Sequence, residues 1–181
     1  MIYPTVAYGD PILKKVAKEI EVNTDIKEIV SNMFETMYEA RGLGLAAPQV
    51  NRSIRLFIID TTEAEEEAPR KLKRAFINPE IIEESDEEWA FEEGCLSIPD
   101  IHSDIMRPES IVLRYYDEEW NLHEEEFDGI NGRVILHEFD HLEGVLFTDY
   151  VQGLQKRLMK KKLINISRGK INTRYKMRFP V

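Results

Sequence analysis

The sequence predicts a domain that mixes helices and strands. Apolar side chains recur with the 3.6-residue period of an amphipathic helix across residues 26–38. Runs rich in β-branched and aromatic residues follow, of which RLFIID at Arg55–Asp60 is the clearest. A second helical run, GRVILHEFDHLEG, occupies Gly132–Gly144. Because 181 residues can bury a substantial core, we expect residues 1–181 to form one domain, with residues 153–181 as a basic C-terminal helix and tail.

The first third of the chain is expected to contain an arm, a helix and a glycine-rich turn. Pro4–Pro11 is typical of an extended arm that ends in a turn. Thr24 or Asp25 can cap the first helix, and Arg41 with the glycine after it can end that helix. The next stretch, GLGLAAPQ at Gly42–Gln49, lacks the Lys-Ser/Thr of a phosphate loop and follows a helix. A helix end followed by a turn therefore explains it on its own.

The middle of the chain is predicted to be mostly strands. A charged loop is expected at Glu63–Arg70, and the acidic run Glu83–Glu88 is expected to form a solvated turn without calcium-ligand spacing. Further strands are expected at Arg74–Ile82 with a break at Asn78-Pro79, near Ile105, at Ile111–Tyr116 and at Leu122–Phe127. Asp128 can cap the next helix, Gly144 can end it, and a last amphipathic helix is expected at Gly153–Ile166.

The helical run at Gly132–Gly144 carries the strongest chemical pattern. His137, Glu138 and His141 lie on one side of a helix, because each residue advances the helix by about 100°. Neutral imidazoles four residues apart can bind one metal ion, and the neighbouring carboxylate can take a proton from a water that the ion holds. A surface helix with two ordinary histidines is the alternative. The apolar residues around the motif favour a buried helix, where unpaired His and Glu would be costly.

A catalytic metal site usually has three protein ligands and one open position, so one ligand is missing from this helix. Phe147 occupies the position of the third His of metzincin proteases, and no acidic residue follows Asp149. The third ligand must therefore come from upstream, where Cys95 is the only thiol. A lone Cys is often a small buried hydrophobic residue, but a thiolate is also a strong metal ligand. Cys95 would complete the set.

Charge is distributed unevenly along the chain. The net charge is −10, with 24 basic and 34 acidic residues, yet residues 153–181 contain ten Lys or Arg and no acidic residue. Residues 1–152 therefore carry a net charge of −20. The basic tail predicts contact with a polyanion, RNA rather than membrane, although a solvated helix face explains the charges equally well. A single Cys, no signal-peptide pattern and no apolar run of about 20 residues favour a cytoplasmic protein without a membrane span.

Three segments, in this order, resemble the signature motifs of the peptide deformylase family: GLGLAAPQ (Gly42–Gln49), EGCLS (Glu93–Ser97) and HEFDH (His137–His141). The family removes the formyl group from the N-terminal formylmethionine of newly made bacterial polypeptides and releases formate. The resemblance covers nearly the whole domain. It implies an α+β fold with mainly antiparallel sheets around a central metal-binding helix.

The resemblance also implies a ligand set and a metal. Cys95, His137 and His141 would hold one divalent ion, natively Fe²⁺, which Zn²⁺, Ni²⁺ or Co²⁺ can replace. Ligand chemistry alone would favour zinc, so the expectation of iron comes from the family.

The remaining site residues are assigned by the same resemblance. Glu138 would accept the proton of the attacking water and deliver it to the leaving amine. The side-chain amide of Gln49 and the backbone N–H of Leu96 would hold the oxyanion. Gly44 and Gly94 would let the substrate backbone pair like an added strand, and an apolar pocket beside the metal helix would receive the methionine side chain.

The basic C-terminal helix resembles a family feature that docks on the ribosome. The expected partners are therefore N-formylmethionyl nascent peptides and the ribosome, without DNA or membrane. The chain departs from the family pattern at Leu136, where the family often has Gln, and at His102, where some members carry Arg. His102 is expected to be either a neighbour of Glu93 or a surface residue. We also expect Asp140 to orient the helix through Arg107.

Two other functions compete with this one. A zinc endopeptidase could use the same helix, but it would need a third His or Glu downstream. A non-catalytic ribosome-binding domain with a structural metal would need neither Glu138 nor Gln49.

Overall fold

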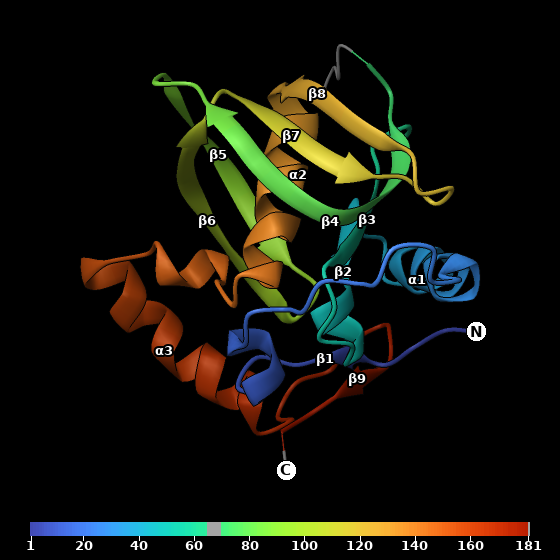
Figure 1. Ribbon diagram of the computed structural model, residues 1–181. Helices are drawn as coiled ribbons and strands as arrows, with labels where there is room; N and C mark the ends of the chain where they lie inside the picture. Colours follow the sequence, from blue (N-terminus) through green and yellow to red (C-terminus); the bar gives the residue numbers. More distant parts are fainter. Residues whose placement is uncertain (65–69, 181) are drawn as a thin grey trace.

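The largest sheet contains five antiparallel strands in the order β2-β3-β4-β7-β8 (Figure 1). The computed structural model describes residues 1–64 and 70–180. The strands of this sheet are β2 (Gly44–Ala46), β3 (Leu56–Asp60), β4 (Lys73–Glu84), β7 (Ser110–Tyr116) and β8 (Leu122–Asp128). The central residues of the loop predicted at Glu63–Arg70 lie outside the described part of the chain.

Two smaller sheets also occur in the part of the chain that the structure describes. β5 (Glu88–Cys95) and β6 (Ile98–Pro108) form an antiparallel hairpin, whereas β1 (Thr5–Val6) and β9 (Met177–Arg178) pair in parallel. The first and last strands of the chain thus lie side by side. The mainly antiparallel α+β architecture agrees with the predicted fold class.

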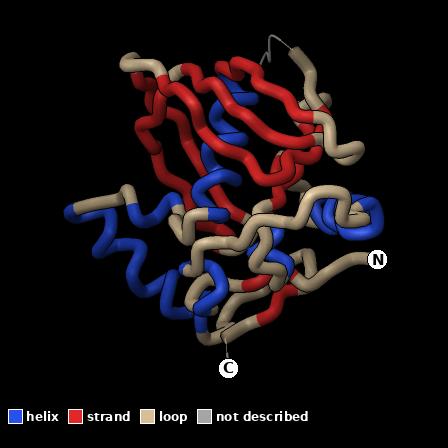
Figure 2. The backbone as a smooth tube through the Cα atoms, in the orientation of Figure 1, coloured by secondary structure: helices blue, strands red, loops and turns tan. Residues whose placement is uncertain are grey.

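The described ranges contain three α-helices: α1 (Lys27–Glu39), α2 (Gly129–Leu142) and α3 (Gly153–Ser167). Short 3-10 turns occur at Pro11–Lys14 (η1), Ala47–Val50 (η2) and Phe147–Asp149 (η3). Figure 2 shows α2 running behind the strands of the large sheet, while α1 and α3 lie at the periphery. None of the helices in the described ranges has the length and apolar character needed to cross a membrane.

The central position of α2 follows from its apolar residues. Ile130, Ile135 and Leu142 are buried in one cluster with Phe57 and Phe76 of the large sheet. The other side of the helix faces the β5–β6 hairpin, and the Arg133 guanidinium donates to the Ile105 carbonyl at 2.8 Å. α2 is therefore held between two sheets. This agrees with the expectation of a buried metal helix.

β4 runs through the position where a break was predicted. Its pairing with β7 shifts register between Ile77 and Glu80, so Asn78-Pro79 forms a bulge and does not end the strand. Asn78 has a φ of 47°, and its side chain bonds the N–H of Ile20 at 2.9 Å and the carbonyl of Ile20 at 2.8 Å. We call residues 1–26, which precede α1, the N-terminal arm; the bulge fixes this arm against the sheet at Ile20.

Three strands differ from the expectation. β2 replaces the turn predicted within Gly42–Gln49, β5 was not predicted, and β6 is much longer than the short strand expected near Ile105. Along β6 the inward positions include Ser103 and Arg107 as well as isoleucines. Because polar residues take core positions, the alternation that marks a half-buried strand is hidden in the sequence.

The predicted helix ends are partly right. Gly144, with a φ of 71°, follows α2 as expected, and α3 ends one residue later than predicted. Ile26, instead of Thr24 or Asp25, precedes α1, although the Asp25 carboxylate accepts the Lys27 N–H at 3.2 Å. Asp128 precedes α2, but its side chain makes no capping hydrogen bond.

Candidate active site

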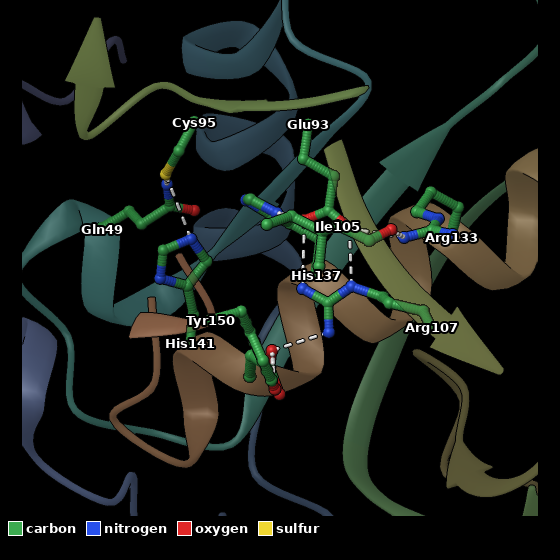
Figure 3. Close-up of polar contacts among 10 residues, drawn as sticks. Gln49, Glu93, Cys95, Ile105, Arg107, Arg133, His137, His141 and Tyr150 are labelled. Atoms are coloured by element: carbon green, nitrogen blue, oxygen red, sulfur yellow. Dashed lines mark hydrogen bonds and ion pairs between the residues drawn. The ribbon is translucent and has the colours of Figure 1, made fainter. Parts of the chain in front are cut away.

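One thiol and two imidazoles from distant parts of the chain meet beside α2 (Figure 3). Cys95 ends β5, and His137 and His141 lie one turn apart on α2. One donor atom from each residue lies within 4.8 Å of the other two. The Cys95 Sγ is 3.3 Å from the His141 Nε2. The structure thus brings together the three side chains expected to bind a metal.

The position of Cys95 depends on the tip of the β5–β6 hairpin. The pairing shifts register after Glu93, and Cys95 then pairs with Ile98 across a tight turn. The Tyr8 N–H donates to the Ser97 carbonyl at 2.8 Å, so the N-terminal arm holds this turn from outside. The bulge directs the thiol toward α2.

Glu138 is a buried carboxyl group beside the metal-ligand cluster. Its exposed fraction is 4%, and its Oε2 atom has no hydrogen-bond partner among the described residues. Burial raises the pKa of Glu138 to about 7, and the nearby Glu93 also raises it. A carboxyl group with this pKa can both accept and release a proton near neutral pH.

Gly44 is required by the position of Glu138. A Cβ atom at Gly44 would lie 2.5 Å from the Glu138 Oε1. At Gly94 a Cβ atom would lie 2.7 Å from the His102 ring. Both glycines predicted to contact substrate therefore also allow close packing inside the protein.

Gln49 lies in η2 and faces Cys95. Its Oε1 accepts the Ala46 N–H at 2.8 Å, which directs its Nε2 toward the Cys95 Sγ at 3.4 Å and the Ser97 Oγ at 3.3 Å. The amide orientation is thus fixed by a backbone donor. The Gln49 side chain therefore places a buried N–H donor beside the metal-ligand cluster.

Glu93 holds His137 from the side opposite the cluster. Its carboxylate lies 2.9 Å from the His137 Nδ1, and it accepts bonds from Arg107 at 2.6 and 3.0 Å and from Arg133 at 3.0 Å. Burial opposes ionisation, but the bonds to His137 and Arg107 hold the pKa of Glu93 well below its usual range. An anionic partner at Nδ1 leaves Nε2 free to bind a metal.

Arg107 connects this carboxylate to α2 in the way predicted. Its guanidinium donates to the Asp140 carboxylate at 2.8 Å, and the Tyr150 hydroxyl donates to the same carboxylate at 2.8 Å. His102 packs against Gly94, and among the described residues it makes no hydrogen bond to Glu93.

Arg133 was not expected in the site. It is 3% exposed and lies one turn before His137 on the same helix. An arginine inside an otherwise apolar run, four residues before a metal-binding His, is the sequence signal that could have identified it.

A cavity of about 710 Å³ opens beside these groups. Its inner part is lined by the buried Gln49 and Glu138, and exposed Arg41 and His102 border it near the surface. The C-terminal segment Asn172–Tyr175 also lines it, which the sequence did not predict. The cavity therefore connects the cluster to solvent.

A family model described as polypeptide deformylase matches residues 2–157. The chain belongs to the polypeptide deformylase family. Curated peptide deformylases from Christiangramia forsetii and Cytophaga hutchinsonii are 53% and 52% identical to it. These alignments cover 99% and 100% of this chain and 97% and 99% of the relatives, respectively.

Solved deformylase structures have the same fold. A peptide deformylase from Legionella pneumophila matches with a TM-score of 0.82 at 33% identity, covering 94% of this chain and 98% of the other. One from Plasmodium falciparum matches with a TM-score of 0.83 at 38% identity, covering 91% and 95%. This deformylase is a hydrolase that removes the formyl group from the N terminus of nascent polypeptides, in a family that uses a catalytic metal.

Proposed function

We propose that deformylation takes place in the cavity beside Cys95, with Cys95, His137 and His141 as the metal ligands. The observation that carries this proposal is the convergence of one thiol and two imidazoles, within 4.8 Å, next to the buried Glu138 carboxyl group. A structural metal site would not need an unpartnered carboxylate oxygen beside it.

The donor set fits one divalent ion. A thiolate with two imidazoles suits Fe²⁺ and Zn²⁺, because each of these side chains offers one donor atom to the same point. We propose Fe²⁺ as the native ion because of the family resemblance, with Zn²⁺, Ni²⁺ or Co²⁺ as substitutes. When bound, the ion supplies Lewis-acid chemistry that lowers the pKa of a water molecule.

Glu138 is the proposed general base and acid. It accepts the proton from the water that attacks the formyl carbon, and it then delivers the proton to the nitrogen of the departing amine. Its buried, unpartnered oxygen and its pKa of about 7 support both steps.

Gln49 and Leu96 are the proposed oxyanion donors. The Gln49 Nε2 is directed by the Ala46 contact into the space next to Cys95, and Leu96 follows Cys95 in the chain and lines the cavity. Two fixed N–H donors would stabilise the negative charge that develops on the formyl oxygen.

The substrate backbone is proposed to pair along Gly44 and Gly94. β2 is an edge strand of the large sheet, and both glycines border the cavity, so a peptide can add to this edge by main-chain hydrogen bonds. The apolar wall formed by Leu43, Ile130 and Val134 is proposed to receive the methionine side chain.

The decisive experiment uses the Glu138→Ala variant with a formyl-Met peptide. Formate release by the metal-loaded variant should fall by at least about 100-fold because the proton acceptor is lost. Bound metal, measured by elemental analysis, should stay near one ion per chain because the ligands remain. Normal turnover in this variant would disprove the assigned base. Cleavage of an internal peptide bond by the wild-type enzyme would favour an endopeptidase instead.

The ribosome is proposed as a partner through α3. Lys156, Lys160 and Lys161 are exposed along this helix, and residues 153–181 carry no acidic side chain to offset them. A cationic helix face is attracted to ribosomal RNA. We accordingly propose that residues 1–181 act as one catalytic domain in the cytoplasm, where formylated chains emerge.

A further inference from the structure

The C-terminal segment after α3 folds back to the active-site cavity. Asn172–Tyr175 line the same cavity as Cys95 and Glu138. This segment lies beyond residues 2–157, which the family model matches. Its contribution to the site is therefore not part of the segment that the family model describes.

Hydrogen bonds on both sides of Tyr175 anchor this segment. The Thr5 N–H donates to the Lys176 carbonyl at 2.9 Å, and the Thr173 Oγ1 donates to the Tyr175 carbonyl at 2.7 Å. β9 follows immediately and pairs with β1. Exposure alternates along the segment, with Arg174 and Lys176 exposed and Tyr175 half-buried. The Tyr175 side chain consequently faces the body of the protein.

The Tyr175 hydroxyl reaches the residue that follows Cys95. It donates to the Leu96 carbonyl at 2.7 Å. Leu96 lies in the hairpin turn after the register shift of β5, so regular strand pairing does not fix it on both sides. The Leu96 carbonyl lies in the peptide plane after the Leu96 Cα atom, and the Leu96 N–H lies in the plane before it, next to the paired residue Cys95. Only the two dihedral angles of Leu96 separate these planes, so holding the carbonyl restricts the movement of Leu96 that would turn its N–H away.

We propose that Tyr175 is a positioning residue for deformylation, which holds the Leu96 N–H in the direction where the oxyanion forms. The inference rests on the proposed role of Leu96 as an oxyanion donor. The C-terminal segment then contributes to catalysis through Tyr175, in addition to stabilising the fold through the pairing of β9 with β1.

The test compares Tyr175→Phe with Tyr38→Phe. Each variant loses one phenol hydroxyl that makes a hydrogen bond, and the Tyr38 hydroxyl donates to Asp60 at 2.5 Å away from the cavity lining. In Tyr175→Phe, kcat per bound metal on a formyl-Met peptide should fall by about 3- to 10-fold, with KM changed by less than about twofold. Tyr38→Phe should retain both values.

Hydrogen exchange supplies a readout that does not depend on activity. Amide exchange in a peptide covering residues 93–98, measured by mass spectrometry on the metal-loaded proteins, should become faster in Tyr175→Phe only. The inference is overturned if kcat per metal and this exchange both match the control. It is equally overturned if Tyr175→Phe lowers only metal content and thermal stability. If wild-type protein releases no formate, the proposed function fails, and the exchange comparison still decides whether Tyr175 orders Leu96.

Discussion

At the residue scale, the site depends on one buried anion. Glu93 is 5% exposed and contacts two guanidinium groups and one imidazole. A buried charge is tolerated only when it is paired, and removal of one partner leaves the other charge without compensation. The orientation of His137 is therefore coupled to the arginines behind it.

Arg107→Met should destabilise the protein strongly. The change removes the two bonds to Glu93 and the bond to Asp140 from a side chain that is 5% exposed. We expect the free energy of unfolding, measured by urea denaturation of the metal-loaded protein, to fall by about 3 to 5 kcal/mol.

Arg114→Met is the matched control for this change. Arg114 pairs with Glu124 at 2.8 Å, but its side chain is 43% exposed, so the loss should stay within about 1 kcal/mol. Equal losses of unfolding free energy in the two variants would show that the buried ion pair stabilises the protein no more than the exposed one.

At the element scale, the bulge in β4 connects the sheet to the N-terminal arm. Asn78 adopts a left-handed conformation, and both polar groups of its side-chain amide bond Ile20. A proline beside this residue is compatible with the strand because the bulge interrupts the ladder of hydrogen bonds. The arm in turn carries β1 and the Tyr8 N–H that holds the Cys95 turn.

Asn78→Ala should therefore cost more stability than Asn51→Ala. Asn51 also has a positive φ, 62°, but its exposed side chain makes no hydrogen bond within the described part of the protein. Both variants lose the preference of Asn for this conformation, and only Asn78→Ala loses two hydrogen bonds. The difference in unfolding free energy, measured by chemical denaturation, should be about 2 kcal/mol. A difference near zero would show that the arm is held by other contacts.

The elements that could be predicted are those with a clear period or a fixed spacing. The histidines of α2 were found because a helix puts residues four apart on one side, and Cys95 because it is the only thiol. Tyr175 was missed because its partner lies in a distant segment, which spacing cannot reveal. For Arg133 the sequence gives only its place one turn before His137, and its partner Glu93 is equally distant in the chain. β5 and most of β6 were missed because charged and polar residues occupy inward positions such as Glu93 and Arg107.

At the scale of the whole molecule, the C-terminal region differs from the rest of the chain in charge but packs as part of the same core. Residues 153–181 are basic and residues 1–152 carry a net negative charge. Met159, Leu163 and Ile166 of α3 are nevertheless buried in one cluster with Val6 and other apolar residues of the body. Deleting this region would also remove Tyr175 and β9. Truncation therefore cannot separate ribosome binding from catalysis, whereas a change of surface charge can.

Reversing three charges on α3 should weaken ribosome binding without loss of activity. Lys160→Glu, Lys161→Glu and Lys162→Glu together change exposed side chains that do not line the cavity. Co-sedimentation with ribosomes at low salt should fall because fewer lysine ammonium groups can contact the phosphates of ribosomal RNA. Formate release from a short formyl-Met peptide should stay at the wild-type rate. Unchanged co-sedimentation would remove the proposed docking role of the helix.

The pairing of β1 with β9 has a consequence for how this enzyme matures. Translation proceeds from the N terminus, so Tyr175 and β9 leave the exit tunnel after every proposed metal ligand. A nascent chain from which Tyr175 and β9 have not yet emerged contains every proposed metal ligand but lacks one wall of the active-site cavity. The cavity is therefore complete only after Tyr175 and β9 have emerged and β9 has paired with β1.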